Sequence, residues 1–351
     1  MRTTGATGTA APTGTDRRRF PDPDQWRRLL GGGAQAADRR RVQVDPDASF
    51  EVVRFSGAAG GPRVAVLGGV HGDEVTGIVA AGLLARIGVP VVAGTLTVVP
   101  VAHQAAADAA SRVSPRDGGN LARTFPGDPA GGPTARLAHR LAQEVLDHAD
   151  LVIDLHTAGR RYDMPFLAGF RSGSAAGPVD AADLAAAFGA DFVWEHPELA
   201  PGRTISHVEQ HGGVGLYVES LGGERLDPGR VHSYVAGVLR VLSRLRLVDA
   251  PADIAVPSPA ARHVRGDGDV DATDLTAQRA GYFVPAAGAG DEVEAGGLLG
   301  VLVDRGGAEL QQLACPRRST VMMMRRAAAV EQGEMLVVLA SPADPAAGPV
   351  S

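Results

Sequence analysis

Short apolar runs alternate with longer amphipathic segments along the first two thirds of the chain. Strand-like apolar runs, most of them bounded by glycine or polar residues, cover residues 63–70, 95–101, 151–155 and 214–219. Helical spacing of apolar positions is found over residues 76–86, 133–147, 180–188 and 231–247. Because strands alternate with helices over residues 50–248, the pattern predicts an α/β sheet covered by helices on both faces.

The pattern changes after about residue 251. Residues 257–259 read Pro-Ser-Pro, which is typical of a linker. Beyond them, glycine turns separate short β-type runs at residues 281–285, 297–303 and 334–339. The chain is therefore predicted to consist of four parts: a disordered tail at 1–19, an α/β domain at 20–252, a small β-rich domain at 253–343 and a frayed end at 344–351.

The composition excludes several kinds of chemistry. All 34 Lys+Arg residues are arginine, which excludes a lysine Schiff base, a phosphate-loop lysine and a lysine-linked carrier. The net charge is 34 − 40 = −6 without a long basic run, which argues against nucleic acid as a partner. Cys315 is the only cysteine, so a metal would be held mainly by His, Asp and Glu. The sequence shows neither a secretory signal nor an apolar run of about 18 residues, so we expect no membrane span and a cytoplasmic location.

Two histidines and a glutamate follow strand-like runs. His71 and Glu74 lie three residues apart after the glycines that end the first run, and His156 directly follows residues 151–155. Taken alone, His71 and Glu74 are as readily ordinary residues of a surface loop, and His156 is as readily a histidine of the core. Together they form a His₂Glu set, and catalytic zinc sites commonly use three such ligands and leave one position for water. Asp154, two residues before His156, is expected to face the same side and support it.

A second carboxylate and an arginine-containing loop complete the candidate site. Glu219 ends an apolar strand, where a carboxylate is costly unless it is used in chemistry or paired with an arginine. Residues 112–127 form a polar, turn-rich loop whose arginines could hold a carboxylate or an oxyanion, although alone it is an ordinary loop. His207 and His211 precede the Glu219 strand without a partner pattern, and a place in the pocket wall is the minority interpretation for them.

These motifs together resemble the succinylglutamate desuccinylase/aspartoacylase family over about residues 50–340. The family's G-G-x-H-G-x-E is matched by residues 68–74, its D-L-H-T by 154–157, its strand-end glutamate by Glu219 and its N-x-x-R-x-F-P-G by 120–127. The resemblance implies a zinc-carboxypeptidase-like fold, with a mixed, mostly parallel sheet, helices on both faces and a small all-β C-terminal domain.

The resemblance also implies a role for each residue. One Zn²⁺ per subunit would be bound by His71, Glu74 and His156. Glu219 would act as general base and then acid, and Arg112 would polarise the scissile carbonyl. Arg123 would bind the substrate carboxylate, with Asn120 as a further substrate-binding residue.

Two departures from the family leave the substrate open. Ala122 stands where many relatives have asparagine, and His103-Gln104 replaces an Asn-Pro. Within the family, the chain is most similar to bacterial enzymes that deacetylate N-acetylated diamino acids, as in ectoine breakdown. We predict a deacylase acting on a small N-acylated amino acid or diamino acid. The alternatives are a zinc carboxypeptidase acting on short or modified peptides and a catalytically inactive zinc-binding module. The oligomeric state is left open.

Overall fold

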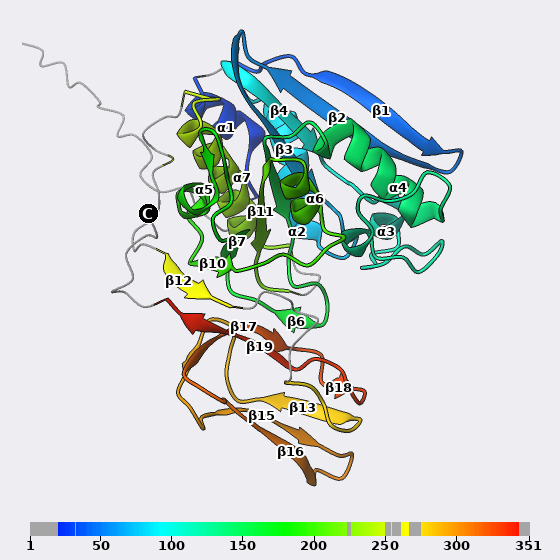
Figure 1. Ribbon diagram of the computed structural model, residues 1–351, viewed down its shortest axis with the longest axis vertical. Helices are drawn as coiled ribbons and strands as arrows, with labels where there is room; N and C mark the ends of the chain where they lie inside the picture. The colour runs from blue at the N-terminus through cyan, green and yellow to red at the C-terminus, as the bar shows by residue number, and fades with distance from the viewer. Residues whose placement is uncertain are drawn as a thin grey trace, which may run out of the picture.

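The computed structural model describes residues 20–31, 33–222, 226–249, 254, 261–266 and 275–343. The predicted tail at 1–19, the linker at 257–259 and the end at 344–351 lie outside these residues. In Figure 1 the described chain forms an α/β unit with a smaller β unit beneath it.

A mixed sheet of 13 strands runs through both units, in the order β1-β2-β4-β3-β5-β11-β7-β10-β12-β19-β17-β14, with β6 paired to β17. The strands of the α/β unit are β1 (Asp38–Asp45), β2 (Ala48–Ser56), β3 (Ala59–Gly68), β4 (Ala93–Val99), β5 (Leu151–Leu155), β6 (Tyr162–Asp163), β7 (Leu167–Arg171), β10 (Phe192–His196) and β11 (Val214–Glu219). The remaining strands of this sheet are β12 (Arg262–Arg265), β14 (Glu292–Val293), β17 (Ser319–Arg325) and β19 (Val337–Pro342). A hairpin of β8 (Ala175–Ala176) and β9 (Val179–Asp180) lies apart.

The centre of the sheet is parallel. β4, β3, β5 and β11 run in one direction, whereas β7 is antiparallel to β11 and β2 is antiparallel to β4. All five residues of β5 are buried, as expected for a strand covered on both faces. The predicted α/β fold with a mixed sheet is confirmed, and parallel pairs predominate within the α/β unit.

Helices cover both faces of this sheet. Side chains of α1 (Pro23–Leu29), α2 (Val75–Ile87), α5 (Ala181–Phe188) and α7 (Pro228–Arg244) share one core. Those of α4 (Pro133–Leu141), the π-helical turn η2 (Ala142–Leu146) and α6 (Thr204–Gln210) share the core on the other face. Three described helices, α1, α5 and α7, begin with an aspartate cap: Asp22, Asp180 and Asp227 each accept a hydrogen bond from a first-turn amide. Along the described ranges, no helix combines the length and apolar character that a bilayer-spanning segment needs.

The C-terminal strands both extend the main sheet and form a small sheet of their own. β12 pairs in parallel with β10 and antiparallel with β19, so hydrogen bonding continues beyond the predicted boundary at residue 252. The small antiparallel sheet has the order β16 (Glu309–Ala314), β15 (Leu298–Val303), β13 (Gly281–Pro285) and β18 (Ala329–Val330). The all-β character predicted for this region is confirmed, and the boundary stays a prediction.

A buried guanidinium ties the C-terminal strands to the rest of the chain. Arg325 on β17 is only 3% exposed, and it donates to the carbonyls of Ala327 at 2.9 Å and Ala329 at 2.7 Å. It also contacts Glu334 at 3.0 Å and the Tyr162 hydroxyl at 3.3 Å.

We expect Arg325→Met to lower the free energy of unfolding by about 3 kcal/mol, because it leaves buried acceptors without their charged donor. Urea denaturation followed by circular dichroism measures this. The exposed neighbour Arg326 is the matched control, and Arg326→Met should change stability by less than about 0.5 kcal/mol. Equal losses in the two variants would contradict the assignment.

Candidate functional site

Three neighbouring parallel strands place the candidate residues at one edge of the sheet. β3, β5 and β11 are adjacent, and their carboxyl ends point the same way. His71 and Glu74 follow β3, His156 follows β5, and Glu219 is the last residue of β11. Residues from three distant segments therefore meet where open α/β sheets bind ligands.

The loop after β3 is held by its glycines. The Gly72 amide donates to the Ser111 carbonyl at 2.8 Å. A Cβ at position 72 would lie 2.0 Å from the carbonyl carbon and oxygen of Ala106, in the short helix α3 (Gln104–Asp108). Only glycine lets this helix support the loop so closely.

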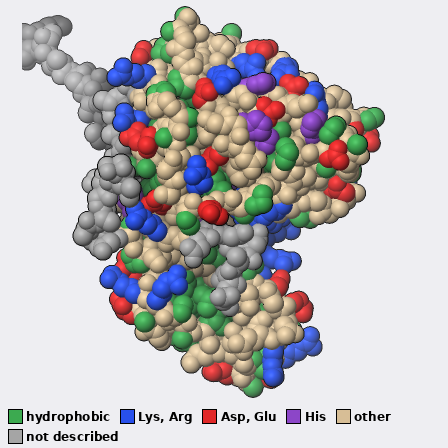
Figure 2. All heavy atoms as spheres, in the orientation of Figure 1, with side chains coloured by type: hydrophobic (Ala, Val, Ile, Leu, Met, Phe, Trp, Pro, Cys, Tyr) green, Lys and Arg blue, Asp and Glu red, His purple; other side chains and the backbone are tan. Residues whose placement is uncertain are grey.

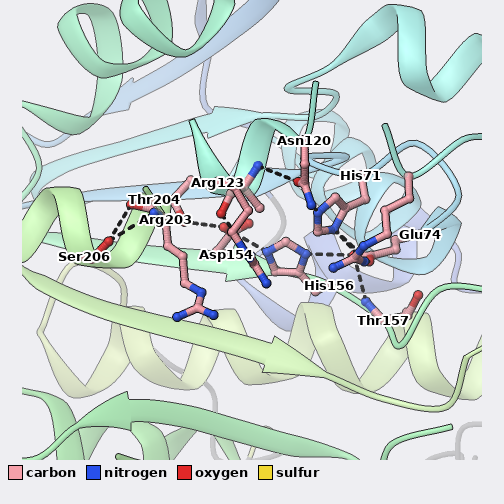
Figure 3. Close-up of polar contacts among 12 residues, drawn as sticks. His71, Glu74, Asn120, Arg123, Asp154, His156, Thr157, Arg203, Thr204 and Ser206 are labelled. Carbon is pink, nitrogen blue, oxygen red and sulfur yellow. Dashed lines mark hydrogen bonds and ion pairs between the residues drawn. The ribbon is translucent and has the colours of Figure 1, made fainter. Parts of the chain in front are cut away.

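The three predicted metal ligands converge. Nδ1 of His71 lies 2.8 Å from Oε1 of Glu74, and Nδ1 of His156 lies 2.8 Å from Oε2 of the same carboxylate. One ligand atom from each residue lies within 4.8 Å of the others, and all three residues are buried. Figure 3 shows the three side chains pointing toward one another.

The far nitrogen of His71 is held by Asn120. The Asn120 Oδ1 accepts a hydrogen bond from the Ala122 amide at 3.0 Å, which identifies that atom as the oxygen. The same oxygen lies 3.1 Å from Nε2 of His71. Nε2 therefore carries the proton, and Nδ1 presents a lone pair to Glu74.

His156 is held in the same way by Asp154. Nε2 of His156 lies 2.9 Å from Oδ2 of Asp154, and that oxygen also accepts the Thr204 hydroxyl. With Nε2 protonated toward this carboxylate, Nδ1 of the neutral ring faces Glu74 with its lone pair. The expected support of His156 by Asp154 is confirmed.

This donor set fits a divalent cation. Two imidazole lone pairs and a carboxylate are all acceptors, so their close approach in a buried site requires a positive charge among them. Nη1 of Arg112 supplies part of it, at 2.9 Å from Oε1 of Glu74 and 3.2 Å from Nδ1 of His71. Two imidazoles and one carboxylate are also the ligand types that zinc-class ions prefer.

The electrostatics of the cluster agree with this interpretation. Burial opposes ionisation of Glu74, but His71 and His156 overcome it and hold the pKa of the carboxyl well below its usual range. Burial also opposes charging of His156, but Asp154 and Glu74 hold the pKa of that ring well above its usual range. The site therefore favours a positive charge beside Glu74, either a proton or a metal ion.

Glu219 differs sharply from Glu74. Burial, reinforced by the charge of Glu74, raises the pKa of Glu219 to about 8. Its Oε2 is buried and has no hydrogen-bond partner among the described residues. A carboxyl group in this state can take up and return a proton near neutral pH.

A cavity of about 890 Å³ opens beside these groups. His71, His156, Glu219 and Arg112 line it, together with Arg123. On its far side it is lined by residues that follow the predicted boundary at residue 252, namely Thr276, Met323, Gly333 and Met335. The C-terminal strands thus form part of the pocket wall.

Not every predicted residue faces the cavity. Arg123 does, and its Nη1 also donates to the Ala122 carbonyl at 3.0 Å. Asn120 is absent from the described lining and lies behind His71, so its role in substrate binding stays a prediction. His207 and His211 also lie outside the described lining.

Among the polar residues of the cavity wall that sequence analysis did not single out are Arg203, His196 and Tyr217. Arg203 lies directly before α6, and His196 ends β10 with Nε2 at 2.6 Å from the hydroxyl of Tyr217. No motif marks them. For Arg203 and His196 the only available signal was a position at the end of an element that precedes the Glu219 strand, and Tyr217 lies within that strand.

Comparison with known proteins gives concordant results. A model of the succinylglutamate desuccinylase/aspartoacylase catalytic domain matches residues 60–245. The chain is 30% identical over 285 residues to the N-alpha-acetyl-L-2,4-diaminobutyric acid deacetylase of Halomonas elongata, covering 80% of this chain and 82% of that protein. A succinylglutamate desuccinylase/aspartoacylase structure from Rhodobacter sphaeroides is 28% identical with a TM-score of 0.76, over 88% of this chain and 96% of that one. The product-bound ectoine utilization protein EutE of Ruegeria pomeroyi shares the fold, with a TM-score of 0.76 and 24% identity over 88% and 96%.

The buried His196 predicts an acid-sensitive contribution to stability. Burial lowers its pKa to about 4, whereas in the unfolded chain it titrates near 6.5. Between these values the unfolded chain binds more protons, so the free energy of unfolding falls as the pH drops from about 6.5 to 4. His196→Gln should reduce this slope by up to about 1.4 kcal/mol per pH unit, measured by denaturant unfolding across the window.

The matched control is His148→Gln, which replaces an exposed histidine. It should keep the slope of the unchanged protein. If His196→Gln also keeps that slope, the buried neutral ring is not the source of the acid sensitivity.

Proposed function

Because the chain belongs to the succinylglutamate desuccinylase/aspartoacylase family, we propose that it is a zinc-dependent amidohydrolase that deacylates a small N-acylated amino acid or diamino acid. The family match and the deacetylase relative support hydrolysis of such an amide. The observation that carries the metal and the mechanism is the convergence of His71, Glu74 and His156 beside Glu219.

His71, Glu74 and His156 would hold the ion through the two Nδ1 atoms and the carboxylate. Zn²⁺ at this position supplies a Lewis acid that lowers the pKa of water toward about 7. Asn120 and Asp154 fix the proton on each Nε2, which leaves both Nδ1 lone pairs available to hold the ion.

The proton is handled by Glu219. Its Oε2, buried and unpartnered among the described residues, takes the proton of the attacking water and then gives it to the leaving amine. The guanidinium of Arg112 stabilises the negative charge that develops on the carbonyl oxygen. Arg123 holds the substrate carboxylate, since a guanidinium binds a carboxylate bidentately.

The cavity favours a small substrate with a second amine. Met323 and Met335 of the C-terminal strands line it, which limits the length of chain that fits beside the metal ligands. Asp73 also lines it, and its buried Oδ1 has no hydrogen-bond partner among the described residues. This carboxylate suits a cationic amine, in keeping with the diaminobutyrate compound named for the Halomonas relative.

Glu219→Gln should bind zinc as the unchanged enzyme does but lose hydrolysis, with kcat lower by at least about 100-fold, because the amide cannot accept the proton. Metal analysis and a steady-state assay on an N-acetylated diamino acid measure the two effects. Glu198→Gln, at an exposed position outside the described lining of the cavity, is the matched control and should retain full activity. Normal turnover in Glu219→Gln would refute the role of Glu219.

A substrate panel separates the three candidate functions. We expect kcat/KM for N-acetylated amino and diamino acids to exceed that for dipeptides by at least about tenfold, because the C-terminal strands form part of the cavity wall and would hinder a longer substrate. Mass spectrometry of the products measures this. The opposite order would favour the carboxypeptidase, and zinc binding without hydrolysis of any compound would favour the inactive binding module.

A further inference from the structure

A second group of metal-ligating side chains lies away from the cavity, on the face of the sheet that carries α4 and α6. His207 lies on α6, His211 directly follows this helix, and Asp147 directly follows η2. One ligand atom from each of the three lies within 4.8 Å of the others. Histidine side chains are visible on this face in Figure 2, and none of the three residues belongs to the described lining of the cavity.

The proton positions can be deduced for His211. Its Nδ1 lies 2.9 Å from the carbonyl oxygen of His207. A carbonyl only accepts, so Nδ1 carries the proton and Nε2 of the neutral ring presents a lone pair. That lone pair faces Oδ1 of Asp147, another acceptor, at 3.9 Å, which is too long for a hydrogen bond.

His207 faces the same carboxylate oxygen. Its Nε2 lies 2.7 Å from Oδ1 of Asp147. Its other nitrogen, Nδ1, is buried without a hydrogen-bond partner in the described structure. The carboxylate is therefore the polar contact that His207 and His211 share, and their ring centroids lie 4.3 Å apart.

The spacing suits a metal ion. Two ligand atoms at about 2.0–2.1 Å from a tetrahedral ion lie about 3.3–3.4 Å apart. The distances of 2.7 and 3.9 Å from Oδ1 of Asp147 to the two imidazoles lie on either side of this value. The side chain of His211 is 45% exposed, so it can turn slightly, and residues four apart on a helix already share one face.

We propose that Asp147, His207 and His211 bind a second divalent transition-metal ion of the zinc class, separate from the catalytic centre. This ion would join the end of η2 to α6. Through Thr204, which donates to Asp154, α6 also supports the catalytic His156. The second site would therefore have a structural role.

Zinc stoichiometry tests the proposal on the full-length, untagged chain by equilibrium dialysis at neutral pH followed by metal analysis. Two ions should bind per chain. His211→Gln should retain the catalytic ion and lower the affinity for the second ion at least about tenfold. Even the loss of a residue that only hydrogen-bonds a metal ligand lowers metal affinity by about that factor. His148→Gln, which replaces an exposed histidine next to Asp147, is the matched control and should bind two ions.

The variant His71→Gln, which removes a proposed ligand of the catalytic ion, separates the test of the second site from that of the catalytic site. His71→Gln should lose one ion and keep the other, and added Zn²⁺ should still raise its Tm. The combined His71→Gln/His211→Gln variant should lose that rise, while its Tm in chelator should match that of His71→Gln. If the unchanged chain binds one ion that His71→Gln abolishes, the second site is refuted while the catalytic centre stands. Equal zinc binding by His211→Gln and the unchanged chain would also refute the second site.

Discussion

The carboxylate of Glu74 is the group on which the site depends. It is buried, it contacts the Nδ1 atoms of two histidines at 2.8 Å, and it accepts a hydrogen bond from Arg112. A buried carboxylate is costly unless opposite charge and hydrogen bonds surround it. The structure meets this requirement by bringing together side chains that follow β3 and β5, and these strands must be parallel neighbours for the contacts to form.

The Nε2 atom of each histidine is contacted by a residue from a different part of the chain. Asn120 starts the short 3₁₀ helix η1 (Leu121–Arg123) and orients His71. Asp154 orients His156 and is itself held by Thr204 at the start of α6. The loop that carries Arg123, helix α6 and the cluster of proposed metal ligands are therefore joined by one network of polar contacts. A displacement of α6 would be felt at His156 through Thr204 and Asp154.

Local sequence patterns were sufficient to predict both a strand and a candidate site residue where that residue lies at the end of the strand. β5 and β11 have the predicted bounds, because buried apolar runs end there in residues that serve the site. The convergence of His71, Glu74 and His156 could be predicted since each follows such a run. The pairing of β12 with β10 could not be predicted, because it joins segments about 70 residues apart through backbone hydrogen bonds. His196 and Arg203 were missed for the same reason, since only the tertiary fold brings them to the cavity.

Glu74 and Glu219 show how one residue type serves two purposes in a single site. Both are buried, and burial alone would raise the pKa of each. Two imidazoles overcome that effect at Glu74 and lower its pKa, which suits the metal-ligand role proposed for it. At Glu219 the neighbouring charge is that of Glu74 itself, which adds to burial and raises the pKa to about 8. The charge of Glu74 thus contributes to the raised pKa that suits Glu219 to its proposed acid–base role. Two groups whose pKa values are driven apart in this way are typical of a site that divides binding from acid–base chemistry.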